Sequence, residues 1–113
     1  MSDSQKLSAG EVIERVFAVI QSRRTADPEQ SYVAKLFQRG MPKIAQKVGE
    51  EAVEVAIASV SGTKEEVIGE SADVLFHLMV MWAAQGIAPE DVTDELARRE
   101  GVSGIVEKKS RNW

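Results

Sequence analysis

Apolar residues recur along this chain three and four positions apart, which is the spacing of one helix face. The pattern predicts helices over about residues 9–22, 28–37, 41–60, 64–85 and 89–99. No segment alternates apolar and polar residues between two hairpin turns, so no strand is predicted. We therefore expect an all-α fold and a single domain over residues 1–113.

Residue types at the helix ends support these boundaries. Residues 8–11 and 63–66 have the sequence of a capping box, in which Ser8 or Thr63 precedes the helix and Glu11 or Glu66 bonds back to it. The capping role already accounts for Glu66, which is therefore not a candidate for a functional site.

Single residues define the second helix and a short last one. Asp27 is the predicted N-cap of the second helix, with Pro28 at the first helical position, where its missing N–H costs least. Gly40 is its predicted end. Ser103 is predicted to cap a short sixth helix.

Only a few residues separate segments 41–60 and 64–85, so these two helices should form an antiparallel hairpin. The second of them is apolar on most sides, which predicts that it is buried on most sides. One hairpin cannot cover it. We expect a homodimer in which paired hairpins form a four-helix core, flanked by the short helices.

Acidic residues lie beside the apolar face of the helix 41–60. At about 100° per residue, that face holds Ile44, Ala45, Val48, Ala52 and Val55. Glu51 lies at its edge, and Glu54 projects in nearly the same direction. A solvated surface with ion pairs to Lys47 explains these two carboxylates as well as a functional site does.

The helix 64–85 carries one narrow polar seam on an otherwise apolar surface. Glu70, Asp73 and His77 follow one another at spacings of three and four. The chain has no Lys or Arg between Glu65 and Ala97, so no residue nearby in sequence neutralises the two carboxylates. A functional site is the better explanation for them, whereas His77 is better explained as a hydrogen-bonded core histidine than as a ligand.

Two acidic pairs on adjacent helices form a site of oxygen donors only, which favours Mg²⁺ or Mn²⁺ over zinc or copper. A di-iron bundle needs Glu-x-x-His on two helices, and the chain has one histidine. Magnesium held by carboxylates is commonly completed by substrate phosphates, so the residues indicate hydrolysis of a phosphoanhydride.

The totals exclude several other classes of function. The net charge of −4 argues against non-specific nucleic-acid binding. The absence of cysteine removes thiol chemistry and suits a reducing cytoplasm. The polar start has no signal-peptide pattern, and no uncharged apolar stretch is long enough to cross a membrane. We expect a soluble cytoplasmic protein.

The acidic motifs carry a resemblance to a known family. Segments 47–54 (KVGEEAVE) and 70–78 (ESADVLFHL) contain the E-E-x-x-E and E-x-x-D signature of the all-α nucleotide pyrophosphohydrolases. With flanks at 27–28, 31–32, 35–36, 40 and 95–99, the chain from about 7 to 111 resembles the phosphoribosyl-ATP pyrophosphohydrolases more narrowly.

The resemblance implies the second step of histidine biosynthesis, in which phosphoribosyl-ATP and water give phosphoribosyl-AMP and pyrophosphate. The magnesium ligands implied are Glu51, Glu54, Glu70 and Asp73. Glu50 is implied either as a further ligand or as the group that orients the attacking water. Lys47, one turn before Glu51, is the candidate for a phosphate contact. Weaker candidates, for which a solvated surface is the better explanation, are Lys35, Lys43 and Arg39. The family is dimeric, and a chain of this length is expected to be a stand-alone form.

Two alternatives remain open at the level of sequence. A house-cleaning pyrophosphohydrolase acting on free or damaged nucleoside triphosphates would share the carboxylates and differ in the base pocket. A non-catalytic helical dimerisation module would instead pair its acidic seam with basic residues of the partner subunit.

Overall fold

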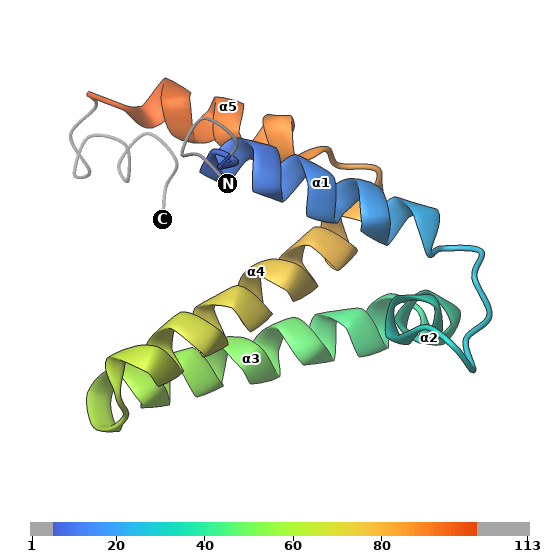
Figure 1. Ribbon diagram of the computed structural model, residues 1–113, viewed down its shortest axis with the longest axis horizontal. Helices are drawn as coiled ribbons and strands as arrows, with labels where there is room; N and C mark the ends of the chain where they lie inside the picture. Colours follow the sequence, from blue (N-terminus) through green and yellow to red (C-terminus); the bar gives the residue numbers. More distant parts are fainter. Residues whose placement is uncertain (1–5, 102–113) are drawn as a thin grey trace.

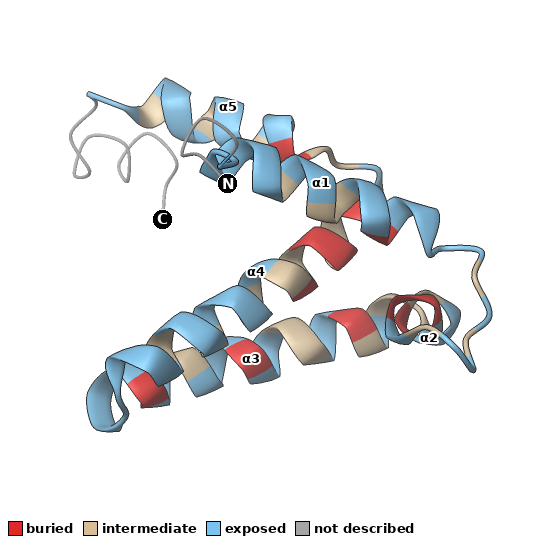
Figure 2. Ribbon diagram, viewed as in Figure 1, coloured by how far each residue is buried: buried red, intermediate tan, exposed pale blue. Residues whose placement is uncertain are grey.

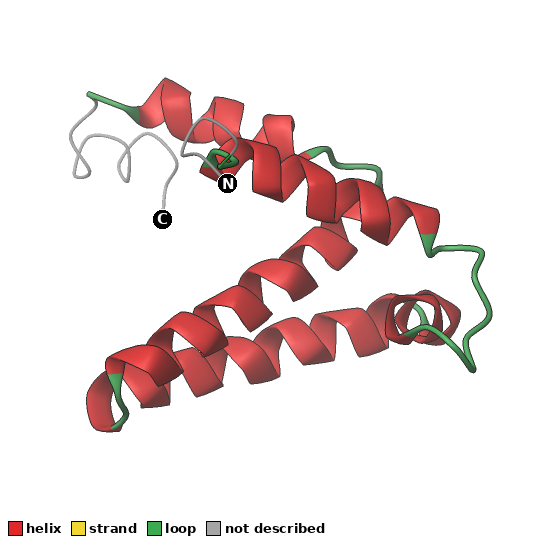
Figure 3. Cartoon of the chain, in the orientation of Figure 1, coloured by secondary structure: helices red, strands yellow, loops and turns green. Residues whose placement is uncertain are grey.

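Five helices form the part of the chain that the computed structural model describes, residues 6–101 (Figure 1). Their bounds are α1 Ala9–Ser22, α2 Tyr32–Arg39, α3 Met41–Ser61, α4 Lys64–Gln85 and α5 Pro89–Arg99. Loops join them, and these residues include no strand (Figure 3). The all-α prediction is confirmed. The predicted cap at Ser103 lies outside the described residues.

Both predicted capping boxes are present. Ser8 Oγ accepts a hydrogen bond from the Glu11 N–H at 3.1 Å, and Glu11 Oε1 accepts one from the Ser8 N–H at 3.0 Å. Thr63 and Glu66 form the same reciprocal pair at 3.2 Å each. Each box satisfies backbone N–H groups that the first helical turn leaves unpaired.

The predicted start of the second helix is wrong by four residues. Asp27 Oδ1 accepts from the Glu29 N–H at 2.9 Å, and the Asp27 carbonyl accepts from the next two N–H groups, which makes a turn. The helix begins instead at Tyr32, because the Ser31 hydroxyl caps it by accepting from the Ala34 N–H at 3.1 Å. The aspartate formed a local side-chain turn, which competes with helix initiation.

Gly40 joins α2 to α3 without an intervening loop. Its N–H bonds to the Leu36 carbonyl, which ends α2, and its own carbonyl accepts from Ile44 in the first turn of α3. The residue has φ 85° and ψ −178°, a backbone region that is accessible essentially only to glycine. Because the connection is this short, α2 holds a fixed position on the start of α3.

The antiparallel hairpin of α3 and α4 is confirmed, with residues 62–63 as its turn (Figure 1). The core lies at the opposite end of the hairpin, where α1, α2, the start of α3 and the C-terminal half of α4 meet. It consists of Ile20, Val33, Leu36, Ile44, Met79, Val80 and Ala83.

The turn half of the hairpin is largely exposed (Figure 2). We expected α4 to be buried on most sides, yet within one chain its buried residues are His77, Met79, Val80 and Ala83. The reason is that the N-terminal half of α4 packs mainly against α3, whereas its C-terminal half also packs against α1. On α3, Ala45 and Ala52 are exposed, and the buried row runs through Ile44, Glu51 and Ala58 instead.

By length and composition alone, α4 would be able to cross a membrane. Its middle carries Glu70 and Asp73, and charged groups at that depth are expensive in lipid. It also packs against α3 and α1. Its C-terminal half, with Met79, Val80 and Ala83, is part of the core.

Candidate metal centre

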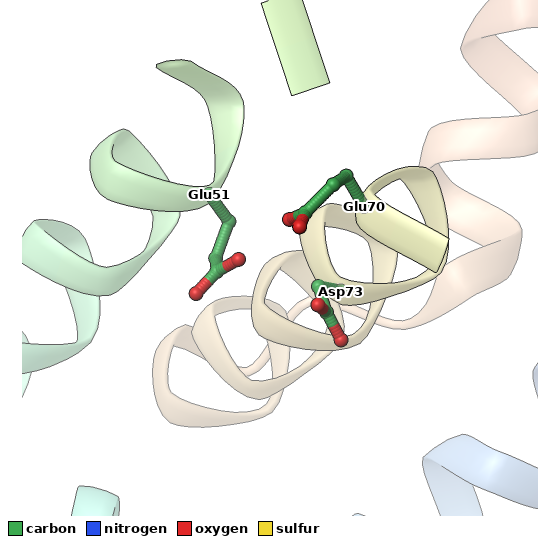
Figure 4. A group of neighbouring side chains, drawn as sticks. All are labelled: Glu51, Glu70 and Asp73. Atoms are coloured by element: carbon green, nitrogen blue, oxygen red, sulfur yellow. The ribbon is translucent and has the colours of Figure 1, made fainter. Parts of the chain in front are cut away.

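Three carboxylates meet across the hairpin. Glu51 comes from α3, and Glu70 and Asp73 come from successive turns of α4; each offers an oxygen within 4.8 Å of the other two. Figure 4 shows Glu51 on α3 facing Glu70, whose carboxylate points across from α4, with Asp73 beside Glu70 on the same helix. The two acidic pairs predicted from sequence therefore contribute to one site.

Two of these carboxylates are withdrawn from water. Glu51 is only 8% exposed, because it occupies the buried row of α3 that faces the hairpin. Glu70 Oε2 is buried, and among the described residues it is the buried side-chain polar atom left without a hydrogen-bond partner. Burying an ionised carboxylate without a compensating group is costly. Within residues 6–101, neither a hydrogen-bond donor nor a positive charge compensates Glu70 Oε2.

Glu54 adds a fourth carboxylate next to Glu51 and Glu70. Its protonated form can share hydrogen bonds with the carboxylates of Glu51 and Glu70, and the charges of both repel its ionised form. The pKa of Glu54 is therefore raised above its ordinary value of 4.5. A cation bound between these carboxylates would reduce the repulsion that Glu54 experiences.

Lys47 compensates part of this charge from one turn earlier on α3. Its Nζ lies 3.3 Å from Glu50 Oε1 and 3.4 Å from Glu51 Oε1. The hydrogen bond to Glu50 raises the pKa of Lys47, so its ammonium stays charged at neutral pH. Glu50 is held on the outer side of α3, where it also accepts from Gln46 Nε2 at 2.7 Å. The ion-paired surface considered for this helix therefore describes Glu50, and only partly Glu51.

Tyr32 belongs to the same region, and the sequence analysis did not identify it. Its hydroxyl lies 2.8 Å from Nε2 of His77, which is buried on α4. Burial raises the pKa of Tyr32, and the charges of Glu51, Glu50 and Asp73 add to that effect. The two residues are 45 positions apart on different helices, so helical periodicity gives no sign of the contact. The core-histidine interpretation of His77 is confirmed.

The remaining candidates lie farther from the cluster. The charge of Lys43 helps to lower the pKa of Glu50, after the hydrogen bonds from Gln46 and Lys47. Lys35 and Arg39 are exposed on α2, and no contact within residues 6–101 ties them to the carboxylates. Glu66 serves as the cap of α4, as predicted.

The donor set fits a hard divalent cation. All the oxygens are carboxylate oxygens, no histidine nitrogen or thiol is directed at the site, and Glu70 Oε2 is a buried oxygen without a partner. Such oxygen-only sets select Mg²⁺, Mn²⁺ or Ca²⁺ over softer metals. An acidic site that can hold a metal ion is therefore present.

Comparison with known proteins assigns the chain to a family. The profile described as phosphoribosyl-ATP pyrophosphohydrolase matches residues 13–100, a range that contains every residue of the site. The chain belongs to the phosphoribosyl-ATP pyrophosphohydrolase family. The resemblance inferred from the acidic motifs and their flanks is thereby confirmed.

Similar members of the phosphoribosyl-ATP pyrophosphohydrolase family match almost end to end. The phosphoribosyl-ATP pyrophosphatase of Azospirillum brasilense is 58% identical over 106 residues, which are 94% of this chain and 95% of that protein. That of Paramagnetospirillum magneticum is 58% identical over 100 residues, 88% of this chain and 92% of its own. A longer relative from Gluconobacter oxydans is 58% identical over 100 residues and is covered to 75%.

The crowding at Glu54 has a measurable consequence in the metal-free protein. A carboxyl whose pKa is raised by folding holds its proton more tightly in the folded state, so its contribution to stability is lost as pH rises above its ordinary pKa of 4.5. Glu54→Gln removes the charge at every pH. We expect this variant to be more stable than wild type at about pH 8, with an advantage that shrinks toward about pH 5.

Urea unfolding in EDTA across this pH range measures the difference. Glu14→Gln, which changes an exposed glutamate of α1, provides the control for loss of a negative charge elsewhere. A stability difference at Glu54 that is independent of pH would contradict the proposed crowding.

Proposed function

We propose that this protein hydrolyses phosphoribosyl-ATP to phosphoribosyl-AMP and pyrophosphate, the second step of histidine biosynthesis, with Mg²⁺ held by Glu51, Glu54, Glu70 and Asp73. The carrying observation is the convergence of Glu51, Glu70 and Asp73 within 4.8 Å across two helices. Membership of the phosphoribosyl-ATP pyrophosphohydrolase family and relatives carrying the name phosphoribosyl-ATP pyrophosphatase support the substrate. Mn²⁺, which has similar ligand preferences, is expected to substitute.

The chemistry follows from the charges of the site. When bound, the cation would polarise a phosphoryl oxygen, offset the repulsion between an acidic site and an anionic substrate, and lower the pKa of the attacking water. The four carboxylates supply the fixed negative charge that retains it. Water cleaves the phosphoanhydride bond between the α and β phosphates, and the products are phosphoribosyl-AMP and pyrophosphate.

The structure supports distinct roles for Lys47 and Glu50 in this reaction. Lys47 stays protonated beside the cluster, so it can contact a phosphate while it limits the net negative charge. Glu50 lies on the outer side of α3 and outside the group of three converging carboxylates. Of the two roles open to Glu50, this position supports orienting the water rather than acting as a further ligand. Lys43 lies near Glu50 and is a further phosphate candidate, followed by Lys35 and Arg39.

We also propose that the active form is a soluble, cytoplasmic homodimer. The radius of gyration is 16.4 Å, against about 13 Å expected for a compact chain of this length. Apolar residues are exposed along the turn half of the hairpin, including Val60 at 88%, Ile57 at 60% and Ile68 at 59%. Ile57 and Val60 are three positions apart on α3 and so lie on one face, and large apolar side chains that gather in the open are typical of an interface. Pairing of two hairpins through it would form a four-helix core.

Two glycines are consistent with this pairing. An added Cβ at Gly49 of α3 or Gly69 of α4 would meet nothing within 4 Å among the described residues. Close packing within one chain therefore does not require either glycine. Their cost of about 1 kcal/mol each in a helix interior is explained if a second copy or the substrate approaches there.

A substrate panel tests the reaction. Purified protein with Mg²⁺ is incubated separately with phosphoribosyl-ATP, ATP, dCTP and dUTP, and pyrophosphate release is followed. We expect phosphoribosyl-ATP to be turned over fastest, and Glu70→Gln to lower kcat by at least about 100-fold through loss of a ligand. Glu66→Gln is the matched control, because it makes the same change one turn earlier on α4 and glutamine still closes a capping box.

Each alternative gives a different result in this experiment. Faster release from a plain triphosphate would identify a house-cleaning enzyme instead. No release from any substrate, together with a melting temperature that Mg²⁺ does not raise, would identify a non-catalytic module.

The dimer is tested at the exposed surface of the hairpin. Ile57→Asp places a charge on the proposed interface and should convert the dimer to monomer in sedimentation velocity, because an unpaired charge is costly in an apolar contact. Glu65→Lys, an exposed change on the same half of the hairpin, is the control. A wild-type protein that sediments as a monomer at micromolar concentration would contradict the proposal.

A further inference from the structure

A hydrogen bond joins α2 to the middle of α4 next to the carboxylate cluster. The His77 ring lies with Nδ1 2.8 Å from the Asp73 carbonyl oxygen and Nε2 2.8 Å from the Tyr32 hydroxyl. A carbonyl oxygen only accepts, so Nδ1 carries the proton and Nε2 is the acceptor. Tyr32 therefore donates its hydroxyl proton to His77. We call this pair the Tyr32–His77 clamp.

Aromatic contacts fix the ring that accepts this bond. The His77 ring packs edge-to-face against Tyr32 at 5.8 Å and against Phe76 at 5.4 Å. His77 is only 6% exposed, whereas Tyr32 is 50% exposed, so the bond runs from a half-exposed side chain of α2 to a buried ring of α4. The acceptor nitrogen thus has a defined position on α4, one helical turn beyond Asp73.

The clamp completes a connection between the two helices of the hairpin. Residues 62–63 join α3 to α4 at one end. Away from this turn, α2 continues into α3 through Gly40, and the first residue of α2 is Tyr32, which bonds to α4. The cluster of Glu51, Glu70 and Asp73 lies between the turn and the clamp, so the helices are tied on both sides of it.

Like charges across the hairpin push its helices apart. Glu51 and Glu54 of α3 oppose Glu70 and Asp73 of α4. The nearby cation is Lys47, which pairs with both Glu51 and Glu50. Among residues 6–101, Lys47 is the basic side chain that forms a salt bridge to this group, and most of the repulsion is left for a bound cation to offset. A tie close to the cluster would keep the carboxylates at binding distance.

Resting on the proposed function, we propose that Tyr32 and His77 are positioning residues that hold α3 and α4 at the separation required to bind the divalent cation. By bonding to His77, the hydroxyl of Tyr32 fixes the position of α4, and thereby the positions of Asp73 and Glu70. Without the clamp, α3 and α4 separate when no cation is bound. Part of the binding free energy of the cation is then used to bring the helices together again, so its apparent affinity falls. The clamp therefore sets metal affinity rather than the rate at saturating metal.

The test measures Mn²⁺ binding directly, from the electron paramagnetic resonance signal of the free ion. Tyr32→Phe removes only the hydroxyl and keeps the ring contacts. We expect its Kd for Mn²⁺ to rise roughly three- to tenfold, the equivalent of one hydrogen bond. At saturating Mn²⁺ its kcat should stay within about twofold of wild type, because the loaded sites are the same.

A control separates this effect from general destabilisation. Arg24→Gln removes two other contacts between distant segments: the hydrogen bond of Arg24 Nη1 to the Ala83 carbonyl at 2.9 Å, at the far end of α4, and the stacking of its guanidinium on the Phe37 ring at the far end of α2. We expect this variant to melt at a lower temperature and to bind Mn²⁺ as wild type does.

Substitutions at His77 test the acceptor. His77→Gln keeps an acceptor on the side chain and should retain a Kd within about twofold of wild type. His77→Leu removes it and should match Tyr32→Phe, with no further loss in the double variant, because both changes break one bond. Far-UV circular dichroism confirms that each variant is folded, and Tyr32→Phe decides the question if His77→Leu is not.

The outcomes distinguish the clamp from the metal site. If wild type binds no Mn²⁺, the proposed metal site is wrong, and the clamp with it. If wild type binds Mn²⁺ and Tyr32→Phe binds it equally well, only the clamp is overturned. A Tyr32→Phe protein with unchanged Kd and a large loss of kcat would also overturn it, since Tyr32 would then contact the substrate.

Discussion

Repulsion among four carboxylates across one helical hairpin is the constraint on which the rest of this structure depends. Glu51 is buried, Glu70 Oε2 has no partner within residues 6–101, and the pKa of Glu54 is raised by its neighbours. Lys47 offsets only part of this charge. A fold stabilised by a few kcal/mol overall retains such an arrangement only where something is gained, and a bound cation with a phosphorylated substrate accounts for the gain.

The surrounding architecture can be understood as the support that this site requires. The core lies at one end of the hairpin and anchors α1 and α2 on α4, while α2 connects directly to α3 through Gly40. The turn half remains exposed and carries apolar side chains, which the proposed second copy would cover. The proposed metal site and the proposed dimer surface therefore lie on the same two helices.

Much of this was predictable from sequence because it is local. Capping residues and glycines defined α1, α3, α4 and α5, and spacings of three and four placed Glu70 and Asp73 on one face. The start of α2 was missed because Asp27 had two local hydrogen-bonding options and made a turn. Tyr32 was missed because its contact with His77 depends on tertiary packing. The burial of Glu51 was missed because helical periodicity does not say which row of residues on α3 faces α4.

The central claim is that the converging carboxylates hold a divalent metal ion. Anomalous diffraction at the manganese edge, from crystals grown with Mn²⁺, tests it most directly because it locates the ion without reference to activity. We predict one or more peaks within bonding distance of carboxylate oxygens of Glu51, Glu70 and Asp73, about 2.0–2.3 Å for an oxygen donor. Ordered crystals with no peak there, and a basic side chain of a second copy between the carboxylates instead, would contradict it.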